Sequence, residues 1–225
     1  MRNIYKCVVC GTFTEDDTHC GKPTKLVING ELRNKLSHLM TYLLRHNPGA
    51  VNLTMDADGW VNINELVNAI KTRWNPRTYS WLTMEHVLAV ALMDPKGRFE
   101  VRDRMIRARY GHNKSLNVNI KYETDYEVKI LYHGTTGDAL TRILREGIKP
   151  MNRKYVHLVL DLKDAYEVAI RHGNNAVILK VNADCLRRNG QQVLIATDRV
   201  RLTSYVPPQC IESVINPRDQ KLKIS

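Results

Sequence analysis

The spacing of apolar residues predicts a helix near the start of the chain. Between positions 32 and 43 apolar residues recur every three or four positions, which is helical spacing, and the Asn-Pro-Gly sequence at 47–49 then ends the helix. Arg45 and His46 are therefore expected at the carboxyl end of this helix.

Two further helices and a basic hairpin follow in the pattern. Asn62 or Asn64 can cap a second helix, and Thr83 can cap a third. Residues 98–101 and 105–109 alternate like two strands of a hairpin. Three helices followed by a basic hairpin predict a winged helix, a lobe that usually binds nucleic acid, although shape alone does not define the ligand or any chemistry.

The second half of the chain has the pattern of a sheet-rich lobe. Residues 113–127 are polar and weakly periodic, which predicts a linker that divides the chain near residue 120. Alternation from Val128 predicts a strand that runs into His133, Gly134 and Thr135, and Gly147 closes the helix after it. Further strands are predicted at 156–160, 176–181, 193–196 and 199–202, with a helix at about 162–172. The fold class is therefore α+β, with segments 1–27, 28–119 and 120–225.

Charge points to a polyanionic partner. The 34 Lys and Arg residues exceed the 23 Asp and Glu residues, giving a formal charge of +11. Positions 96–114 hold seven basic residues and two acidic ones, so the excess forms a patch, although a generally basic surface is the plainer alternative. No apolar run approaches the roughly 18 residues of a membrane helix, so we expect a cytoplasmic protein without a membrane partner. We also expect a monomer.

The cysteines predict a metal site. Cys7, Cys10 and Cys20 have the spacing of a zinc knuckle, and His19 is the candidate fourth ligand. Its place beside Cys20 makes tetrahedral binding awkward, which leaves a water, a more distant His or incomplete binding open as alternatives. Reduced thiols in a loose N-terminus are the alternative. An odd total of five cysteines argues against a disulfide framework, so we expect Cys185 and Cys210 to be unpaired core residues.

Five motifs in one order resemble a known family, the RNA 2'-phosphotransferases. They are Leu-Leu-Arg-His at 43–46 followed by Asn-Pro, Asp-Ala-Asp-Gly-Trp at 56–60, Lys-Gly-Arg-Phe at 96–99, His-Gly-Thr at 133–135, and Met-Asn-Arg-Lys-Tyr-Val-His-Leu at 151–158. The family's usual Gln-Gly-His-Ser stands here as Tyr-Gly-His-Asn at 110–113, which leaves the details of RNA contact open. The N-terminal cysteines resemble an extension on archaeal members. The resemblance implies an N-terminal zinc knuckle and winged-helix lobe joined to an ADP-ribosyltransferase-like lobe that binds NAD without a Rossmann GxGxxG motif.

The resemblance also implies an activity, the transfer of an internal 2'-phosphate of spliced tRNA to NAD. The products are RNA with a 2'-hydroxyl, nicotinamide and ADP-ribose 1'',2''-cyclic phosphate. It carries catalytic roles onto Arg45, His46, Arg98 and Arg153. NAD contacts are expected from His133, Gly134, Thr135 and His157, and RNA contacts from Arg107, Arg109 and His112.

These residue types suit phosphate chemistry. Arginine offers planar, permanently charged donors that bind phosphate in pairs, and a histidine with a pKa near about 6.5 can move a proton at neutral pH. Taken singly, Arg45 and His46 could instead complement the carbonyl end of a helix, and Arg98 and Arg107 could be wing charges that bind a phosphate backbone. His133 and His157, also taken singly, could be ordinary core or surface histidines. Two alternative functions stay open: an ADP-ribosyltransferase that stops after the first step on nucleic-acid phosphates, and a non-catalytic, zinc-bearing winged-helix regulator.

Overall fold

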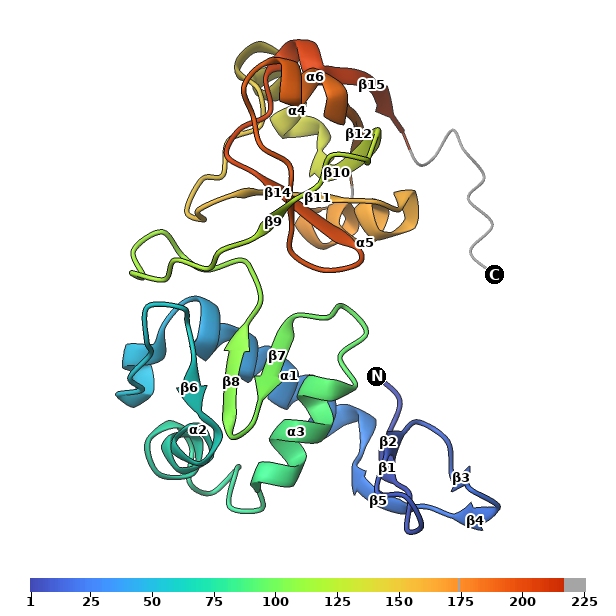
Figure 1. Cartoon of the computed structure of the whole chain (residues 1–225), viewed down its shortest axis with the longest axis vertical. Helices are drawn as coiled ribbons and strands as arrows, with labels where there is room; N and C mark the ends of the chain where they lie inside the picture. Colours follow the sequence, from blue (N-terminus) through green and yellow to red (C-terminus); the bar gives the residue numbers. More distant parts are fainter. Residues whose placement is uncertain (174, 217–225) are drawn as a thin grey trace. The chain divides into compact units, whose positions relative to one another are not determined.

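The computed structural model describes residues 1–173 and 175–216, in two compact units. The first unit is Met1–Lys121 and the second begins at Tyr122 (Figure 1). Helices and strands are mixed in the chain, and the described residues include six α-helices. None of the helices in that part of the chain is long and apolar enough to cross a membrane.

The first unit opens with short strands. Their bounds are β1 Ile4–Lys6, β2 Phe13–Thr14, β3 Thr18–His19, β4 Lys22–Pro23 and β5 Lys25–Ile28. One sheet has the order β2-β1-β5, and β3 pairs with β4 as a separate hairpin. Ile4 and Ile28 from this sheet are buried in the same hydrophobic core as Leu36 and Leu43. The segment 1–27, which the sequence suggested as a knuckle of its own, therefore shares a core with the helices.

The helices of the first unit match the predicted spacing. Their bounds are α1 Gly30–Arg45, the 3-10 helix η1 Pro48–Val51, α2 Ile63–Ala69, the π-helix η2 Ile70–Trp74 and α3 Met84–Leu92. The Asn29 side chain caps α1, and Asn62 rather than Asn64 caps α2. Thr83 and His86 form a capping box at α3.

The basic hairpin is also confirmed. Its strands are β7 Phe99–Arg102 and β8 Met105–Ala108, and β6 Val61–Asn62 joins them in the order β6-β8-β7. Asp103 turns the hairpin with a φ of +55°, a left-handed conformation that Asp tolerates better than most residues. Phe99, Ile106 and Ala108 face the core, so the hairpin packs on the helices through alternate residues.

The second unit is an antiparallel sheet with helices on its faces. Its elements are β9 Glu123–Thr124, β10 Ile130–Thr136, α4 Gly137–Glu146, β11 Val156–Val159, α5 Leu162–His172, β12 Ala176–Asn182, α6 Ala183–Arg188, β13 Leu194–Ile195, β14 Val200–Thr203, the 3-10 helix η3 Pro208–Cys210 and β15 Ile211–Ile215. The strand order is β15-β12-β10-β11-β14-β13-β9. β10 and β11 join at the single pair Tyr132 and Val159, whereas β10 and β12 pair along their whole length. The predicted linker contains β9, which pairs with β13 and so belongs to this sheet.

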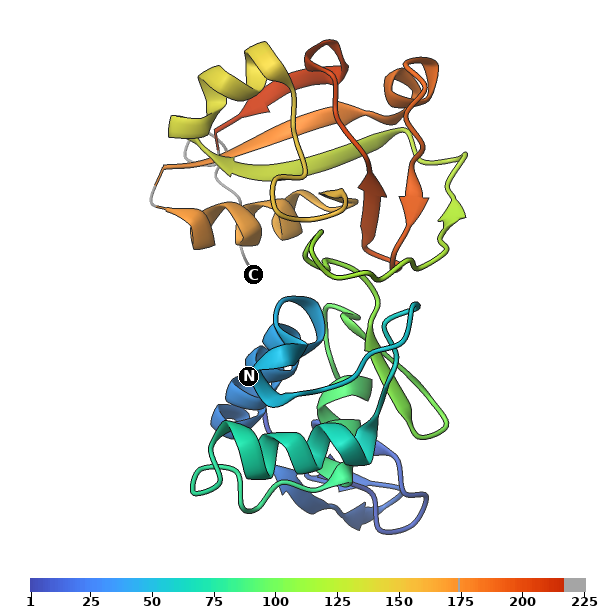
Figure 2. The same cartoon turned by 90° about the vertical axis from the view of Figure 1, so that its left-hand side faces the viewer.

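Helices α4 and α5 lie on opposite faces of β10 (Figure 2). Gly147 ends α4 with a φ of +76°, as the sequence predicted. A Cβ on Gly134 would stand 2.1 Å from the Ala165 carbonyl oxygen, so α5 packs directly on the main chain of β10. Since strand side chains alternate, His133 and Thr135 face α4.

The expectation that Cys185 and Cys210 are unpaired core residues was wrong. They form a disulfide that joins α6 to η3, with their Cα atoms 5.3 Å apart. The odd count misled because the other three cysteines belong to a separate cluster, which leaves an even pair in the second unit.

Candidate functional site

Arg45 and His46 end helix α1, as the sequence predicted. The apolar residues of α1 bury one face of the helix, and the Asn-Pro sequence after His46 stops it. Arg45 is 8% exposed and its guanidinium lies 4.4 Å from the centre of the Tyr110 ring, a cation–π contact. His46, by contrast, is exposed.

The Tyr-Gly-His-Asn segment at 110–113 surrounds Arg45. The main-chain N–H of Asn113 donates to the Arg45 carbonyl oxygen at 2.8 Å. Gly111 has a φ of +87°, and a Cβ there would stand 3.2 Å from the guanidinium carbon of Arg45. His112 is buried beside Gly59. The segment that departs from the family's usual letters thus shapes the surroundings of Arg45, and His112, expected to contact RNA, is a packed residue.

Arg98 is held along the same helix. Its Nε and Nη2 donate to the buried Asp94 carboxylate, with Nη2 to Oδ1 at 2.6 Å. Nη2 also donates to Ser37 Oγ at 2.7 Å, and Nη1 reaches Thr41 Oγ1 at 3.4 Å. Ser37 lies in the middle of α1 and Thr41 lies one turn before Arg45, so Arg98 is held against the helix that ends at Arg45.

The hairpin arginines are braced by the protein. Arg107 donates to Glu100 and to the Asp58 carbonyl oxygen, and its guanidinium lies 4.5 Å from the Trp60 ring. Arg109 donates from Nε to the Phe99 carbonyl oxygen at 3.1 Å. Both side chains therefore have fixed positions on the hairpin.

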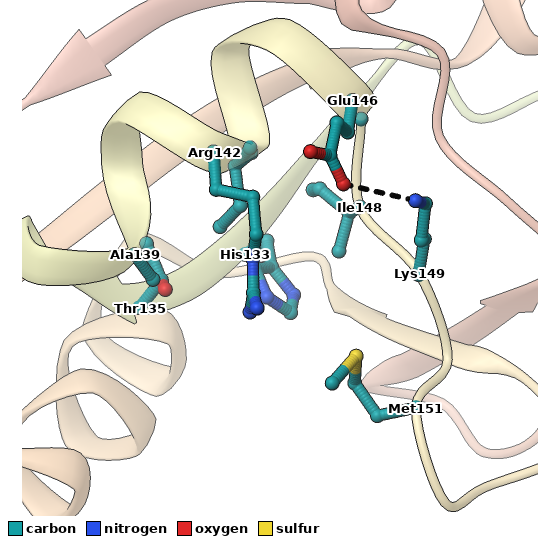
Figure 3. Close-up of a pocket in the computed structure, with 10 residues that line it drawn as sticks. His133, Thr135, Ala139, Arg142, Glu146, Ile148, Lys149 and Met151 are labelled. Atoms are coloured by element: carbon teal, nitrogen blue, oxygen red, sulfur yellow. Dashed lines mark hydrogen bonds and ion pairs between the residues drawn. The ribbon is translucent and has the colours of Figure 1, made fainter.

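A cavity of about 350 Å³ opens between β10 and α4 in the second unit (Figure 3). His133 and Thr135 project into it from the strand, so two of the expected NAD contacts share one cavity. The rest of the lining was not predicted from the sequence and consists of Ala139, Arg142, Ile143, Glu146, Gly147, Ile148, Lys149 and Met151. The three- and four-residue spacing of Ala139, Arg142 and Glu146 on a helix that follows His-Gly-Thr is the signal that could have found them.

Charges line one side of this cavity. Lys149 Nζ lies 3.0 Å from Glu146 Oε2 (Figure 3), and Arg145 pairs with the other carboxylate oxygen. Arg145 and Lys149 together hold the pKa of Glu146 at about 2. With Arg142 on the neighbouring turn, this wall carries more positive than negative charge, which suits an anionic ligand.

His133 and Arg153 are linked through His157. The His133 Nδ1 donates to the His157 carbonyl oxygen at 3.0 Å, so a neutral His133 keeps an acceptor lone pair on Nε2. Burial lowers the pKa of His133, and the nearby charges of His172 and Arg153 lower it further, against the carbonyl bond. Arg153 Nη1 lies 2.5 Å from His157 Nδ1. Arg153, a candidate catalytic residue, is thus connected through His157 to His133 in the cavity, within the second unit.

Gly134 lies on the other face of β10. Its Cα points at α5, and a side chain there would collide with the main chain of Ala165 and Ala169. The glycine is required by the packing of α5, and this contact accounts for its place between His133 and Thr135.

The N-terminal cysteines and His19 form a cluster that could hold a metal ion. One ligand atom from each of Cys7, Cys10, His19 and Cys20 lies within 4.8 Å of every other. The Val9 and Cys10 amides point at Cys7 Sγ, at 3.4 and 3.5 Å. The Cys10 amide is the largest cause that lowers the pKa of Cys7 to about 7. A thiolate, the form that binds metals, is therefore favoured there.

The β3–β4 turn explains how neighbouring residues reach one site. Cys20 and Gly21 both have positive φ, +52° and +70°, as in the tight hairpin turns that match strand twist. This turn brings Cys20 Sγ to 3.2 Å and Cys10 Sγ to 3.5 Å from His19 Nδ1. The adjacency of His19 and Cys20, which made tetrahedral binding look awkward, is thus compatible with a shared cluster.

Comparisons with known proteins decide the family. Residues 31–205 match the family model described as RNA 2'-phosphotransferase, Tpt1 / KptA family. The chain belongs to this family. A probable RNA 2'-phosphotransferase of Hyperthermus butylicus is 44% identical over 228 residues, covering 98% of this chain and 97% of its own. Proteins with the same description from Pyrobaculum aerophilum and Pyrococcus furiosus are 39% and 46% identical, covering 96% and 84% of this chain and 98% and 100% of their own.

The residues expected to act in an RNA 2'-phosphotransferase therefore fall into two groups, one in each unit. In the first unit Arg45 and His46 lie at the end of α1 and Arg98 is held against the same helix, and the second unit connects Arg153, His157 and His133. Each group is fixed by contacts within its own unit.

Proposed function

We propose that the protein is an NAD-dependent RNA 2'-phosphotransferase that removes an internal 2'-phosphate from spliced tRNA. The observation that carries the proposal is the second unit's cavity, which His133 and Thr135 line and which His157 connects to Arg153, in a chain of this family. The second unit acts as an ADP-ribosyltransferase-like lobe, and residues 28–119 act as a winged-helix lobe for RNA.

The first step of the reaction joins the two substrates. An oxygen of the RNA 2'-phosphate attacks the ribose carbon that carries nicotinamide in NAD, and the carbon–nitrogen bond to nicotinamide breaks. The phosphate is already anionic, so it needs positioning by cations more than a strong base. Arg45, Arg98 and Arg153 supply these cations, and Thr135 and the Nε2 of a neutral His133 bind the NAD ribose or amide.

The second step releases the RNA. The 2''-hydroxyl of the ADP-ribose, on the carbon next to the one that now carries the phosphate, attacks the phosphorus. The bond from phosphorus to the RNA 2'-oxygen breaks, and the hydroxyl proton ends on that oxygen. His46 carries the proton, because it is exposed and its residue type titrates near neutrality. The arginines stabilise the added charge on the five-coordinate phosphorus.

Lys149, Arg142 and zinc extend the proposal. Lys149 and Arg142 line the cavity and suit the diphosphate of NAD. The Lys149 ammonium offers a compact positive charge, and the Arg142 guanidinium offers a planar set of donors. A zinc ion bound by Cys7, Cys10, His19 and Cys20 has a structural role, since four protein ligands leave no open position for chemistry.

The direct test is incubation of the purified chain with NAD and a short RNA that bears one internal 2'-phosphate. We expect RNA with a 2'-hydroxyl, nicotinamide and ADP-ribose 1'',2''-cyclic phosphate. Arg153→Ala should abolish nicotinamide release and leave the circular dichroism spectrum unchanged. The matched control is Arg188→Ala, which removes an exposed arginine on α6 and should leave nicotinamide release intact.

The other outcomes identify the alternatives. ADP-ribose that stays on the RNA would indicate an ADP-ribosyltransferase that stops after the first step. Tight, strongly salt-dependent binding to nucleic acid without any consumption of NAD would indicate a non-catalytic winged-helix protein.

A further inference from the structure

Two large aromatic side chains stand exposed beside the end of α1. Tyr42 is 38% exposed and Trp74 is 42% exposed, and their ring centres are 5.7 Å apart at an interplanar angle of 51°. Trp74 ends the π-helix η2, so segments 32 residues apart in sequence contribute to one surface. We refer to Tyr42 and Trp74 as the aromatic pair.

The aromatic pair is held in place from both sides. The Asn47 side chain donates to the Tyr42 hydroxyl at 3.0 Å. Next to Trp74, Arg73 donates to the Val51 carbonyl oxygen at 2.9 Å, which fixes the end of η2 against η1. Rigid rings lose little entropy when they bind, so exposed aromatic side chains fixed in this way suit recognition.

Tyr42 of the aromatic pair lies close in sequence to a proposed catalytic residue. It stands in the last turn of α1 and precedes the C-cap residue His46 by four positions, so the two main-chain positions are about one 5.4 Å turn apart along the helix. Residues 66–84 include Lys71, Arg73 and Arg77 and no acidic residue, so the Trp74 side of the pair is positively charged. A ligand with both flat rings and negative charge is the one that fits.

We propose that the aromatic pair is a stacking platform for one unpaired RNA base that flanks the nucleotide bearing the 2'-phosphate. Unpaired bases are commonly bound by stacking on Tyr and Trp, whereas bases inside an RNA helix are inaccessible to such contacts. A docked protein is disfavoured because two partly exposed rings fall far short of the roughly 800 Å² per partner that a stable interface buries. The proposal rests on RNA being the substrate, and it adds that the RNA must be single-stranded next to the phosphate.

The first experiment measures binding without catalysis. A single-stranded RNA of about ten nucleotides with 2'-hydroxyls is titrated into the protein in the absence of NAD, and tryptophan fluorescence is followed. We expect quenching that Trp74→Phe removes, because Trp60 is buried and Trp81 is half-buried. Trp74→Ala should weaken binding by between about 5-fold and 150-fold, the range for one stacked base. Leu92→Ala, at a still more exposed apolar residue at the end of α3, should leave the affinity unchanged.

The second experiment separates the platform from the proposed activity. With NAD and 2'-phosphorylated RNA, Trp74→Ala and Tyr42→Ala should raise the KM for RNA, leave the KM for NAD unchanged and keep kcat at saturating RNA. A perfect duplex around the phosphate should be a poor substrate for the wild type. Wild-type affinity and KM in both alanine variants, with spectra showing that they are folded, would overturn the platform. Weakened RNA binding in these variants together with a wild type that never consumes NAD would support the platform and reject the phosphotransferase.

Discussion

Removal of the Cys185–Cys210 disulfide should destabilise the second unit by an amount that follows from its loop. The two cysteines are 25 residues apart in sequence. In the chain-entropy description, opening a loop of this length costs about 3.5 kcal/mol at 25 °C, because the unfolded chain regains the freedom that the cross-link removed. With a urea dependence of about 2 kcal/mol per M, the unfolding midpoint should fall by roughly 1.8 M.

The perturbation is Cys185→Ala with Cys210→Ala, compared with each single variant. Cys210 is fully buried, so part of the loss in any Cys210 variant comes from packing, whereas Cys185→Ala alone opens the same loop and keeps the buried sulfur. A thiol reductant is a poor substitute because it would also compete for a metal ion held by Cys7, Cys10 and Cys20.

The assay can assign the loss to the right unit. All three tryptophans, Trp60, Trp74 and Trp81, belong to the first unit, so their fluorescence follows that unit. Amide hydrogen exchange on peptides from β12 and β15 follows the second. We expect the loss of stability in β12 and β15, and three reactive thiols in the denatured, unreduced wild type. Five reactive thiols, or an unchanged exchange rate in Cys185→Ala, would refute the reasoning.

Three further predictions concern the metal cluster, His133 and Gly134. Metal analysis should find about one zinc per chain, and free zinc at about 1,000 times its Kd should stabilise the first unit by about 4 kcal/mol; carefully purified protein without zinc would contradict this. Because burial holds the pKa of His133 below its ordinary value of 6.5, the folded state resists protonation, so stability is complete above about pH 6.5 and falls as the pH drops toward the lower folded pKa. Urea midpoints from pH 5 to 8 should therefore vary less in His133→Gln than in the wild type. The same pH dependence of the midpoint in both proteins would contradict a lowered pKa of His133. Gly134→Ala should cost more than about 3 kcal/mol in urea unfolding because its Cβ would collide with α5, whereas Gly190→Ala, which has open space around it, should cost about 1 kcal/mol; equal losses would argue against the close packing of β10 on α5.

Hydrophobic spacing predicted the longer elements. Helix α1, the β7–β8 hairpin, β10 and α5 each bury a regular face, so their apolar positions carry the helical or strand period directly. The N-terminal sheet escaped prediction because its strands are two to four residues long, too short for a period to be visible. The missed helix α6 has the same limitation, since it spans only six residues.

Pairing and orientation were less accessible than secondary structure. The disulfide depends on α6 and η3 meeting, and neither element has a clear sequence pattern. Arg142 and Lys149 line the cavity only because α4 packs beside β10, and this packing is not visible in the sequence. Likewise, sequence marks Arg107 as basic but does not reveal that Glu100 and Trp60 already hold it.

The buried arginines of the first unit show why burial alone does not identify a phosphate-binding residue. Arg33 is almost fully buried, and it donates to the Arg2 and Met93 carbonyl oxygens and to Glu15, so it joins three separate segments. This distribution of donors is typical of a structural role. Arg98 pairs with Asp94 four residues away and also donates to Ser37 and Thr41 on α1, so it too joins separate segments of the first unit. Its contacts therefore resemble those of Arg33, and the proposed role of Arg98 in binding phosphate depends on the Lys-Gly-Arg-Phe motif at 96–99; a cation already fixed in this way would require no reorganisation when the reaction begins.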